Sequence, residues 1–82
     1  MINVEVTDNA TNKAVGYQVK RKFDKQVEFL KTNTRHRSLD FKPLKSGNGI
    51  WRFRVNDHYW GLTYKKPDAK NTLVVYDVIK HP

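Results

Sequence analysis

Hydrophobic and polar residues alternate at the start of the chain. In segment 2–7, Ile2, Val4 and Val6 share one side, and the residues between them are polar. This period of two predicts a strand with one buried face. The polar segment 8–12 predicts a break in structure that also supplies N-cap candidates for a following helix.

From about residue 14 the apolar spacing changes to steps of four and three, which is typical of a helix with one apolar face. The residues on this face are Val15, Val19, Phe23, Val27 and Leu30. Gly16 weakens the first turn by roughly 1 kcal/mol relative to Ala, so the helix is expected to begin near residue 14 or only near Tyr17. Its other face is mostly basic and is predicted to be exposed to solvent.

Three further strands are expected after an irregular stretch that runs from residue 32 to 49. In segment 50–55 the apolar residues alternate with Arg52 and Arg54, and Asn56-Asp57 predicts a hairpin turn. Residues 58–64 form the expected return strand. Segment 72–80 is the most apolar of the chain and is expected to lie inside the sheet.

This order of elements predicts an α+β domain: a small antiparallel sheet of about four strands, with one or two helices from the N-terminal half packed on one face. Eighty-two residues fit a single domain, 1–82. The absence of cysteine excludes disulfides and thiolate metal sites, and no segment has the pattern of a secretion signal or a membrane span. We therefore expect a soluble, cytoplasmic protein with no membrane partner.

Positive charge is concentrated in the middle of the chain. The formal net charge is +8, and segment 20–54 holds eleven of the sixteen Lys and Arg residues against Asp24, Glu28 and Asp40. Such clustering favours a polyanionic partner such as RNA, although a solvated, solubilising face is the simpler alternative.

Arg52 and Arg54 are two residues apart on a predicted strand, so both project from one side of the sheet. Two guanidinium groups held in this way suit a phosphate clamp, but an exposed strand face often carries arginine. Trp60 lies beside Phe53 in the core if the hairpin loop has two residues, and beside Arg52 on the outer face if it has three. Three His residues without regular spacing give a poor zinc signature, so no metal is expected.

Residues 33–45, Asn-Thr-Arg-His-Arg-Ser-Leu-Asp-Phe-Lys-Pro-Leu-Lys, resemble the loop after the helix in toxins of the RelE/ParE superfamily. In those toxins an Arg-His-x-Ser-Leu run leads into a Lys-x-Leu-Lys-Gly-like segment. The similarity continues through segment 49–55, His58-Tyr59 and a closing apolar strand that ends in Lys80-His81. It covers roughly residues 14–81 and rests on the order of several short motifs, none of which is diagnostic alone.

The resemblance implies a curved antiparallel sheet with a basic concave face, and a cognate antitoxin as protein partner. It also implies one of two activities. The RelE-like branch, which is favoured here, consists of endoribonucleases (mRNA interferases) that cut messenger RNA in the ribosomal A site without a metal or other cofactor and so inhibit translation. The ParE-like branch poisons DNA gyrase.

Metal-free cleavage of RNA requires groups that activate a 2′-hydroxyl, stabilise the phosphorane and protonate the 5′-oxygen. On the resemblance, the expected catalytic residues are His81, as acid or base, with Arg54 and Arg52. The expected RNA contacts are Lys42, Lys45, Arg35, Arg37 and Trp60. Because His81 is the penultimate residue, a frayed terminal residue is the alternative reading.

Two departures from the resemblance keep other functions open. Trp60 occupies a position where relatives usually carry Arg. Relatives also often have a Tyr after the His, whereas this sequence has only Pro82 after His81. Trp60 offers base stacking instead. The alternatives are a non-nuclease member, either a gyrase poison or a module whose active site has decayed, and a basic RNA- or ribosome-binding protein outside the toxin family.

Overall fold

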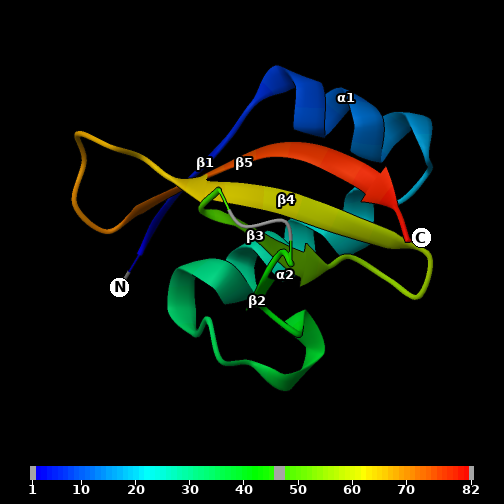
Figure 1. Cartoon of the computed structure of the whole chain (residues 1–82). Coiled ribbons are helices and arrows are strands. Elements are labelled where there is room, and N and C mark those ends of the chain that lie inside the picture. Colours follow the sequence, from blue (N-terminus) through cyan, green and yellow to red (C-terminus); the bar gives the residue numbers. More distant parts are fainter. Residues whose placement is uncertain (1, 46–47, 82) are drawn as a thin grey trace.

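A computed structural model describes residues 2–45 and 48–81, which form two α-helices, a short 3-10 helix and five strands (Figure 1). The elements, in chain order, are β1 (Asn3–Val6), α1 (Asp8–Gly16), α2 (Lys20–Thr32), η1 (Arg37–Leu39), β2 (Lys42–Pro43), β3 (Ile50–Arg54), β4 (Tyr59–Lys65) and β5 (Thr72–Lys80). The predicted α+β class is confirmed. No helix in the described part of the chain is long and apolar enough to span a bilayer.

The strands form one sheet in the order β1-β5-β4-β3-β2. β1 pairs with β5 in parallel, and every other neighbouring pair is antiparallel. The sheet is therefore mixed and has five strands, whereas an antiparallel sheet of about four strands was expected. Alternation identified segment 2–7 as a strand, but it carries no information about which strand would become its partner.

The fifth strand is β2, which has only two residues and pairs with the start of β3. It lies in the stretch that was expected to be irregular. Pro43 has no backbone N–H to donate to a sheet ladder, which suits it to an edge strand this short.

The segment predicted as a break, residues 8–12, is instead the first half of α1. The side chain of Thr7 caps this helix by accepting a hydrogen bond from the backbone N–H of Ala10 at 3.2 Å. Ala10 and Ala14 are fully buried, and α1 packs against β5. Val15, which was assigned to the core stripe, is 56% exposed. The buried residues of this helix are alanines, whose small side chains give only a weak apolar pattern in the sequence.

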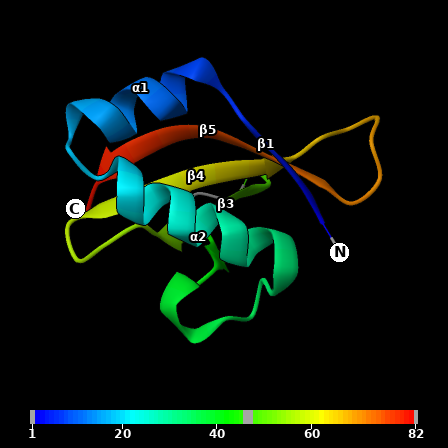
Figure 2. The same ribbon diagram turned by 180° about the vertical axis from the view of Figure 1, so that it is seen from behind.

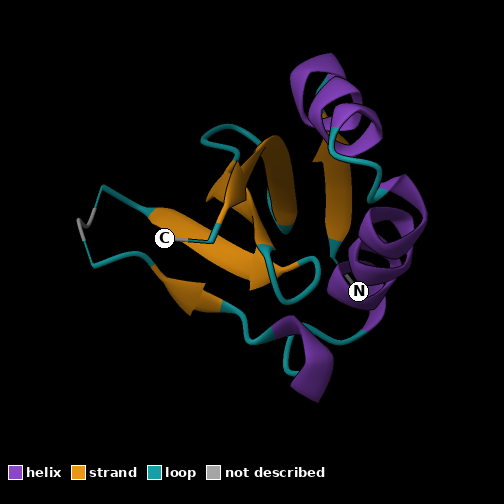
Figure 3. Ribbon diagram, turned by 90° about the vertical axis from the view of Figure 1, so that its right-hand side faces the viewer, coloured by secondary structure: helices purple, strands orange, loops and turns teal. Residues whose placement is uncertain are grey.

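The two helices are separated by Gln18, whose φ of +61° lies in the left-handed region and ends the α-helical run. Phe23, Val27 and Leu30 of α2 are buried as predicted, and the Phe23 ring packs 6.2 Å from that of Phe53 in β3. Both helices lie on the same side of the sheet (Figures 2 and 3). We call the other side the open face.

The loop between β3 and β4 has three residues, because Val55 and Tyr59 are joined by a hydrogen bond from the Val55 N–H to the Tyr59 carbonyl. The side chain of Asn56 stabilises this turn by accepting from the backbone N–H groups of His58 and Tyr59, at 2.8 and 3.0 Å. The longer of the two expected loops is therefore the one that forms. It sets Trp60 opposite Arg54, on the open face, whereas the expected partner was Arg52.

Candidate functional site

The two strand arginines belong to the open face. Phe53 lies between them and is fully buried under α2, so Arg52 and Arg54 project to the other side. Trp60, directly across from Arg54 on β4, shares that side. The alternation that predicted a pair of outward-facing arginines is confirmed.

Arg52, Trp60 and His81 form a continuous row on the open face. The Arg52 guanidinium carbon lies 4.2 Å from the centroid of the Trp60 ring, a cation–π distance. The Trp60 and His81 rings meet edge to face, with centroids 4.5 Å apart. The His81 backbone N–H donates to the His58 carbonyl at 2.6 Å, so the chain is fixed to the β3–β4 loop at this residue. His81 is exposed, but it is not a frayed residue.

Asp40 fixes the first member of the row. It adopts the left-handed conformation after η1, with a φ of +46°. Its carboxylate pairs with Lys42 Nζ at 3.1 Å and with Arg52 Nη1 at 3.3 Å, and its carbonyl accepts a further hydrogen bond from Arg52. The hydrogen bond from Lys42, followed by that from Arg52, outweighs partial burial and lowers the pKa of Asp40 below its usual value. Part of the positive charge at this site is therefore neutralised from within the fold.

Sequence reasoning counted Asp40 only as one acid in a basic segment and missed this role. Its partner Arg52 lies on β3, twelve residues along the chain. Lys42, one of the expected RNA contacts, sits opposite Arg52 in the β2–β3 pair, so the structure brings it beside the row.

Gln26 is a second residue that was missed. It is 1% exposed, and its amide nitrogen donates to the carbonyls of Ser38 and Arg54 at 3.0 and 2.9 Å. It therefore ties the end of β3 to the loop that carries η1. The signal was present in the sequence, since Gln26 falls on the helix face that holds Phe23 and Leu30 and is the polar residue among them.

Arg54 stands at the end of β3, beyond the two β3 residues that pair with β2. It lines a pocket of about 320 Å³ at the junction of α2, η1 and the β3–β4 loop, together with Lys22, Gln26, Ser38, Asn56 and Asp57. Arg54 is exposed, and among the described residues it forms no ion pair. It is therefore the arginine of the open face whose charge remains available.

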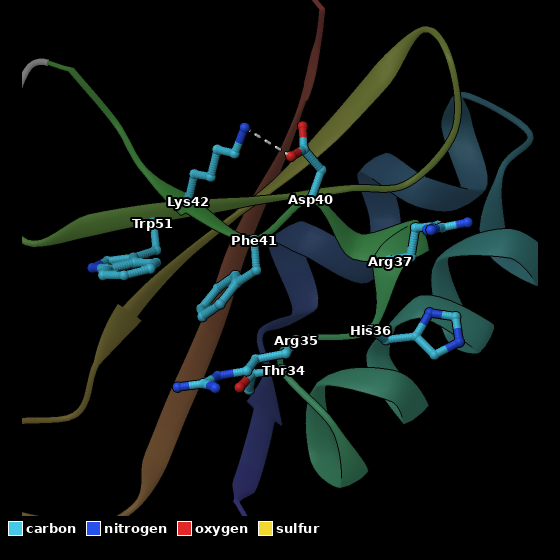
Figure 4. A pocket seen from close by; sticks show the side chains of 8 residues that line it. All are labelled: Thr34, Arg35, His36, Arg37, Asp40, Phe41, Lys42 and Trp51. Atoms are coloured by element: carbon cyan, nitrogen blue, oxygen red, sulfur yellow. Dashed lines mark ion pairs between the residues drawn. The ribbon is translucent and has the colours of Figure 1, made fainter.

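The basic loop residues lie elsewhere. Arg35 and Arg37 line a larger pocket of about 510 Å³, which we call the loop pocket, with Thr34, His36, Asp40, Phe41, Lys42 and Trp51 (Figure 4). Trp51 alternates with Arg52 on β3, so its ring is on the opposite side of the sheet from the row. Lys42 and Asp40 border both places. Lys45 is exposed beyond β2 and has no described contact with either.

His36 holds the shape of this loop. Its Nδ1 lies 2.9 Å from the Ser38 hydroxyl and accepts from the Ser38 backbone N–H at 3.2 Å. The imidazole stacks on the Phe29 ring at a centroid distance of 3.7 Å. Within residues 2–45 and 48–81, no three His, Asp or Glu side chains gather closely enough to hold a metal ion.

The row and its neighbours combine three chemical capacities. Arg52, Arg54 and Lys42 can bind the oxygens of a phosphate. Trp60 presents an aromatic ring beside them, and His81 adds an imidazole that can accept or donate a proton. This set suits an anionic, partly aromatic ligand such as a nucleotide.

Comparison with known proteins identifies the fold of the chain. No protein-family model matches the chain, and neither does any curated protein. Several solved structures are similar over nearly the whole chain. A YoeB/ParE toxin from Agrobacterium tumefaciens has 16% identity and a TM-score of 0.73, covering 99% of this chain and 100% of its own.

The YoeB dimer from Staphylococcus aureus has 15% identity and a TM-score of 0.71, covering 99% and 98% of the two chains. The RelE chain of an archaeal RelE–RelB complex from Pyrococcus horikoshii has 12% identity and a TM-score of 0.72, covering 96% and 93%. The predicted resemblance is thus confirmed for the architecture: this chain has the fold of the RelE- and YoeB-type toxins.

Proposed function

We propose that this chain is the toxin of a type II toxin–antitoxin pair and cleaves messenger RNA on the ribosome without a metal. The observation that carries the proposal is the row of Arg52, Trp60 and His81 on the open face, with Arg54 opposite Trp60. The fold shared with YoeB and RelE toxins adds support.

The reaction is an attack of a ribose 2′-oxygen on the adjacent phosphorus. The bond from the 2′-oxygen to phosphorus forms as the bond to the 5′-oxygen breaks, leaving a 2′,3′-cyclic phosphate and a 5′-hydroxyl. The 2′-hydroxyl proton leaves to a base, and the 5′-oxygen gains a proton from an acid. No oxidant, metal or cofactor is required for this balance.

In our proposal Arg54 binds the scissile phosphate and stabilises the extra negative charge of the phosphorane. Arg52 is held by Asp40 and Trp60, so it supplies a fixed guanidinium with little conformational entropy to lose. His81 is the acid or base, and the Trp60 ring orients its imidazole by edge contact and stacks against an unpaired base.

The proposed protein partner is an antitoxin that covers the basic surface. Structures with the same fold include the archaeal RelE–RelB complex and the Escherichia coli DinJ–YafQ toxin–antitoxin complex. A net charge of +8 favours an acidic antitoxin segment.

One observation favours a second candidate function, a toxin that does not cut RNA, such as a gyrase poison. Asp40 neutralises part of the charge of Arg52 and Lys42, which reduces the phosphate-binding capacity of the row. Such a protein would arrest growth through gyrase-dependent DNA breaks and leave messages intact.

The test is inducible expression followed by primer extension on a reporter message, with wild type beside Arg54→Ala and His81→Gln. The matched control is Lys70→Ala, which removes an exposed cation from the β4–β5 turn. Growth arrest with new message ends that disappear in the two site variants and persist in the control supports the proposal. Arrest with intact message and broken DNA selects the second candidate.

A further inference from the structure

The loop pocket contains an aromatic pair, the partly buried Phe41 and the exposed Trp51, that the proposed nuclease site does not use. The Phe41 and Trp51 rings have centroids 4.9 Å apart with their planes inclined by 36°. Trp51 remains 39% exposed, although large aromatic rings usually gain stability by burial. Figure 4 shows both rings on the same side of the pocket as the Arg35 side chain.

The same pocket carries cations whose charge is not neutralised by described neighbours. Arg35 and Arg37 are exposed, and neither forms an ion pair within the described part of the chain. The carboxylate that borders the pocket, Asp40, is occupied by Lys42 and Arg52. The pocket therefore combines the exposed Trp51 ring with the available guanidinium of Arg35, whereas the Arg37 side chain points away from the rings (Figure 4).

We propose that the loop pocket binds one nucleotide of single-stranded RNA, with its base on Trp51 and its phosphate at Arg35. Unpaired bases stack on aromatic rings, and each such contact is worth about 1–3 kcal/mol by alanine substitution. An acidic peptide would use the arginine but leaves the exposed Trp51 ring without a partner, so a nucleotide fits the pocket better.

The loop pocket and the row lie on opposite sides of β3, because Trp51 and Arg52 are consecutive residues of that strand. RNA bound in the pocket is thus held away from the phosphate that the row would cleave. That the bound nucleotide anchors the RNA for cleavage rests on the proposed function. Binding of the nucleotide itself does not depend on that function.

The experiment uses the fluorescence of Trp51. The chain has two tryptophans, so Trp60→Phe leaves Trp51 as the reporter. The purified variant is titrated with a short 2′-O-methyl oligoadenylate, which lacks the free 2′-hydroxyl needed for cleavage. We expect saturable quenching that weakens with salt. In the same background, Arg35→Gln should weaken binding about tenfold, whereas Lys70→Gln, with the same loss of charge, should change it less than about twofold.

A second pair of variants tests the ring in a chain that keeps Trp60. Trp51→Phe retains an aromatic face and should retain most of the affinity for a dye-labelled oligoadenylate, whereas Trp51→Leu should lose about tenfold or more. Melting curves establish that both variants are folded. Equal affinity of Trp51→Leu and Trp51→Phe would overturn the proposal.

Two further results would also overturn it: absence of Trp51 quenching by the oligoadenylate, or equal quenching by an oligoglutamate, which would assign the pocket to an acidic peptide. Message cleavage by the wild type is measured as well, so that failure of the loop pocket can be told from failure of the proposed nuclease. Cleavage without Trp51 quenching would refute the pocket alone, and Trp51 quenching without cleavage would refute the nuclease alone.

Discussion

Replacing Asp40 by Asn tests the electrostatic arrangement of the open face. The substitution removes the carboxylate that pairs with Lys42 and Arg52 but keeps the size of the side chain. Asn also accepts the left-handed backbone conformation that residue 40 adopts, with its φ of +46°, so the loop should keep its path.

The expected cost in stability is small. Partly exposed ion pairs contribute roughly 0.2–1 kcal/mol each, and the Arg52 pair should lie near the upper end because the Arg52 side chain is only 16% exposed. Together the two pairs predict a loss of about 1 kcal/mol, or about 4–8 °C in melting temperature for a domain of this size.

The difference should depend on pH in a defined direction. The pKa of Asp40 is lowered in the folded protein, so its carboxylate stabilises the fold at pH values above the unfolded pKa. This contribution is lost as the pH falls through the folded pKa. Wild type and Asp40→Asn should therefore differ in melting temperature at neutral pH and converge in strong acid.

The effect on RNA binding should be opposite to the effect on stability. Without Asp40, Arg52 and Lys42 have their full charge available for phosphate, so affinity for an uncleavable RNA should rise. One additional phosphate contact increases the salt dependence of log K by about 0.7 for a single strand.

The matched control is Asp24→Asn. It makes the same change in net charge by breaking the Lys20–Asp24 pair on the surface of α2, where the Asp24 side chain is 56% exposed. Affinity and salt dependence should stay nearly unchanged in this control. If Asp40→Asn and Asp24→Asn behave alike, or if Asp40→Asn weakens binding, Arg52 is not a phosphate contact and the reasoning is wrong.

Three other substitutions probe the supports of the site. Gly61→Ala should destabilise the fold by about 1–3 kcal/mol in denaturant unfolding, because its Cβ would overlap the Phe53 ring; an unchanged midpoint would contradict this close approach. Gln26→Met should cost about 1–3 kcal/mol in the same assay and reduce message cleavage, since two carbonyls lose their buried donor. Trp60→Leu should weaken RNA binding about fivefold or more, measured by anisotropy, through loss of base stacking and of the Arg52 cation–π contact, and no change would remove Trp60 from the site.

Much of the fold follows from local patterns. Alternation around Phe53 placed Arg52 and Arg54 on one side of a strand, and the helical spacing of Phe23, Val27 and Leu30 identified the buried face of α2. These features depend on residues that are close in sequence, so the spacing of apolar residues along the chain is enough to find them.

The features that were missed depend on pairing between distant segments. The parallel partner of β1 is the last strand of the chain, and strand periodicity does not specify partners. The position of Trp60 depended on a one-residue difference in loop length, which the side chain of Asn56 decides by accepting two backbone hydrogen bonds. The sequence also did not show that Arg35 and Arg37 lie apart from the row, because a count of charged residues does not say where their side chains lie in the fold.

The most direct test of the central claim is primer extension on ribosome-bound message incubated with the purified protein and its His81→Gln variant. We predict new message ends with the wild type, loss of these ends with His81→Gln, and retention of them with Lys70→Ala. Intact message with the folded wild-type protein, or equal cleavage by His81→Gln, would contradict the claim that the Arg52, Trp60 and His81 row is a ribonuclease active site.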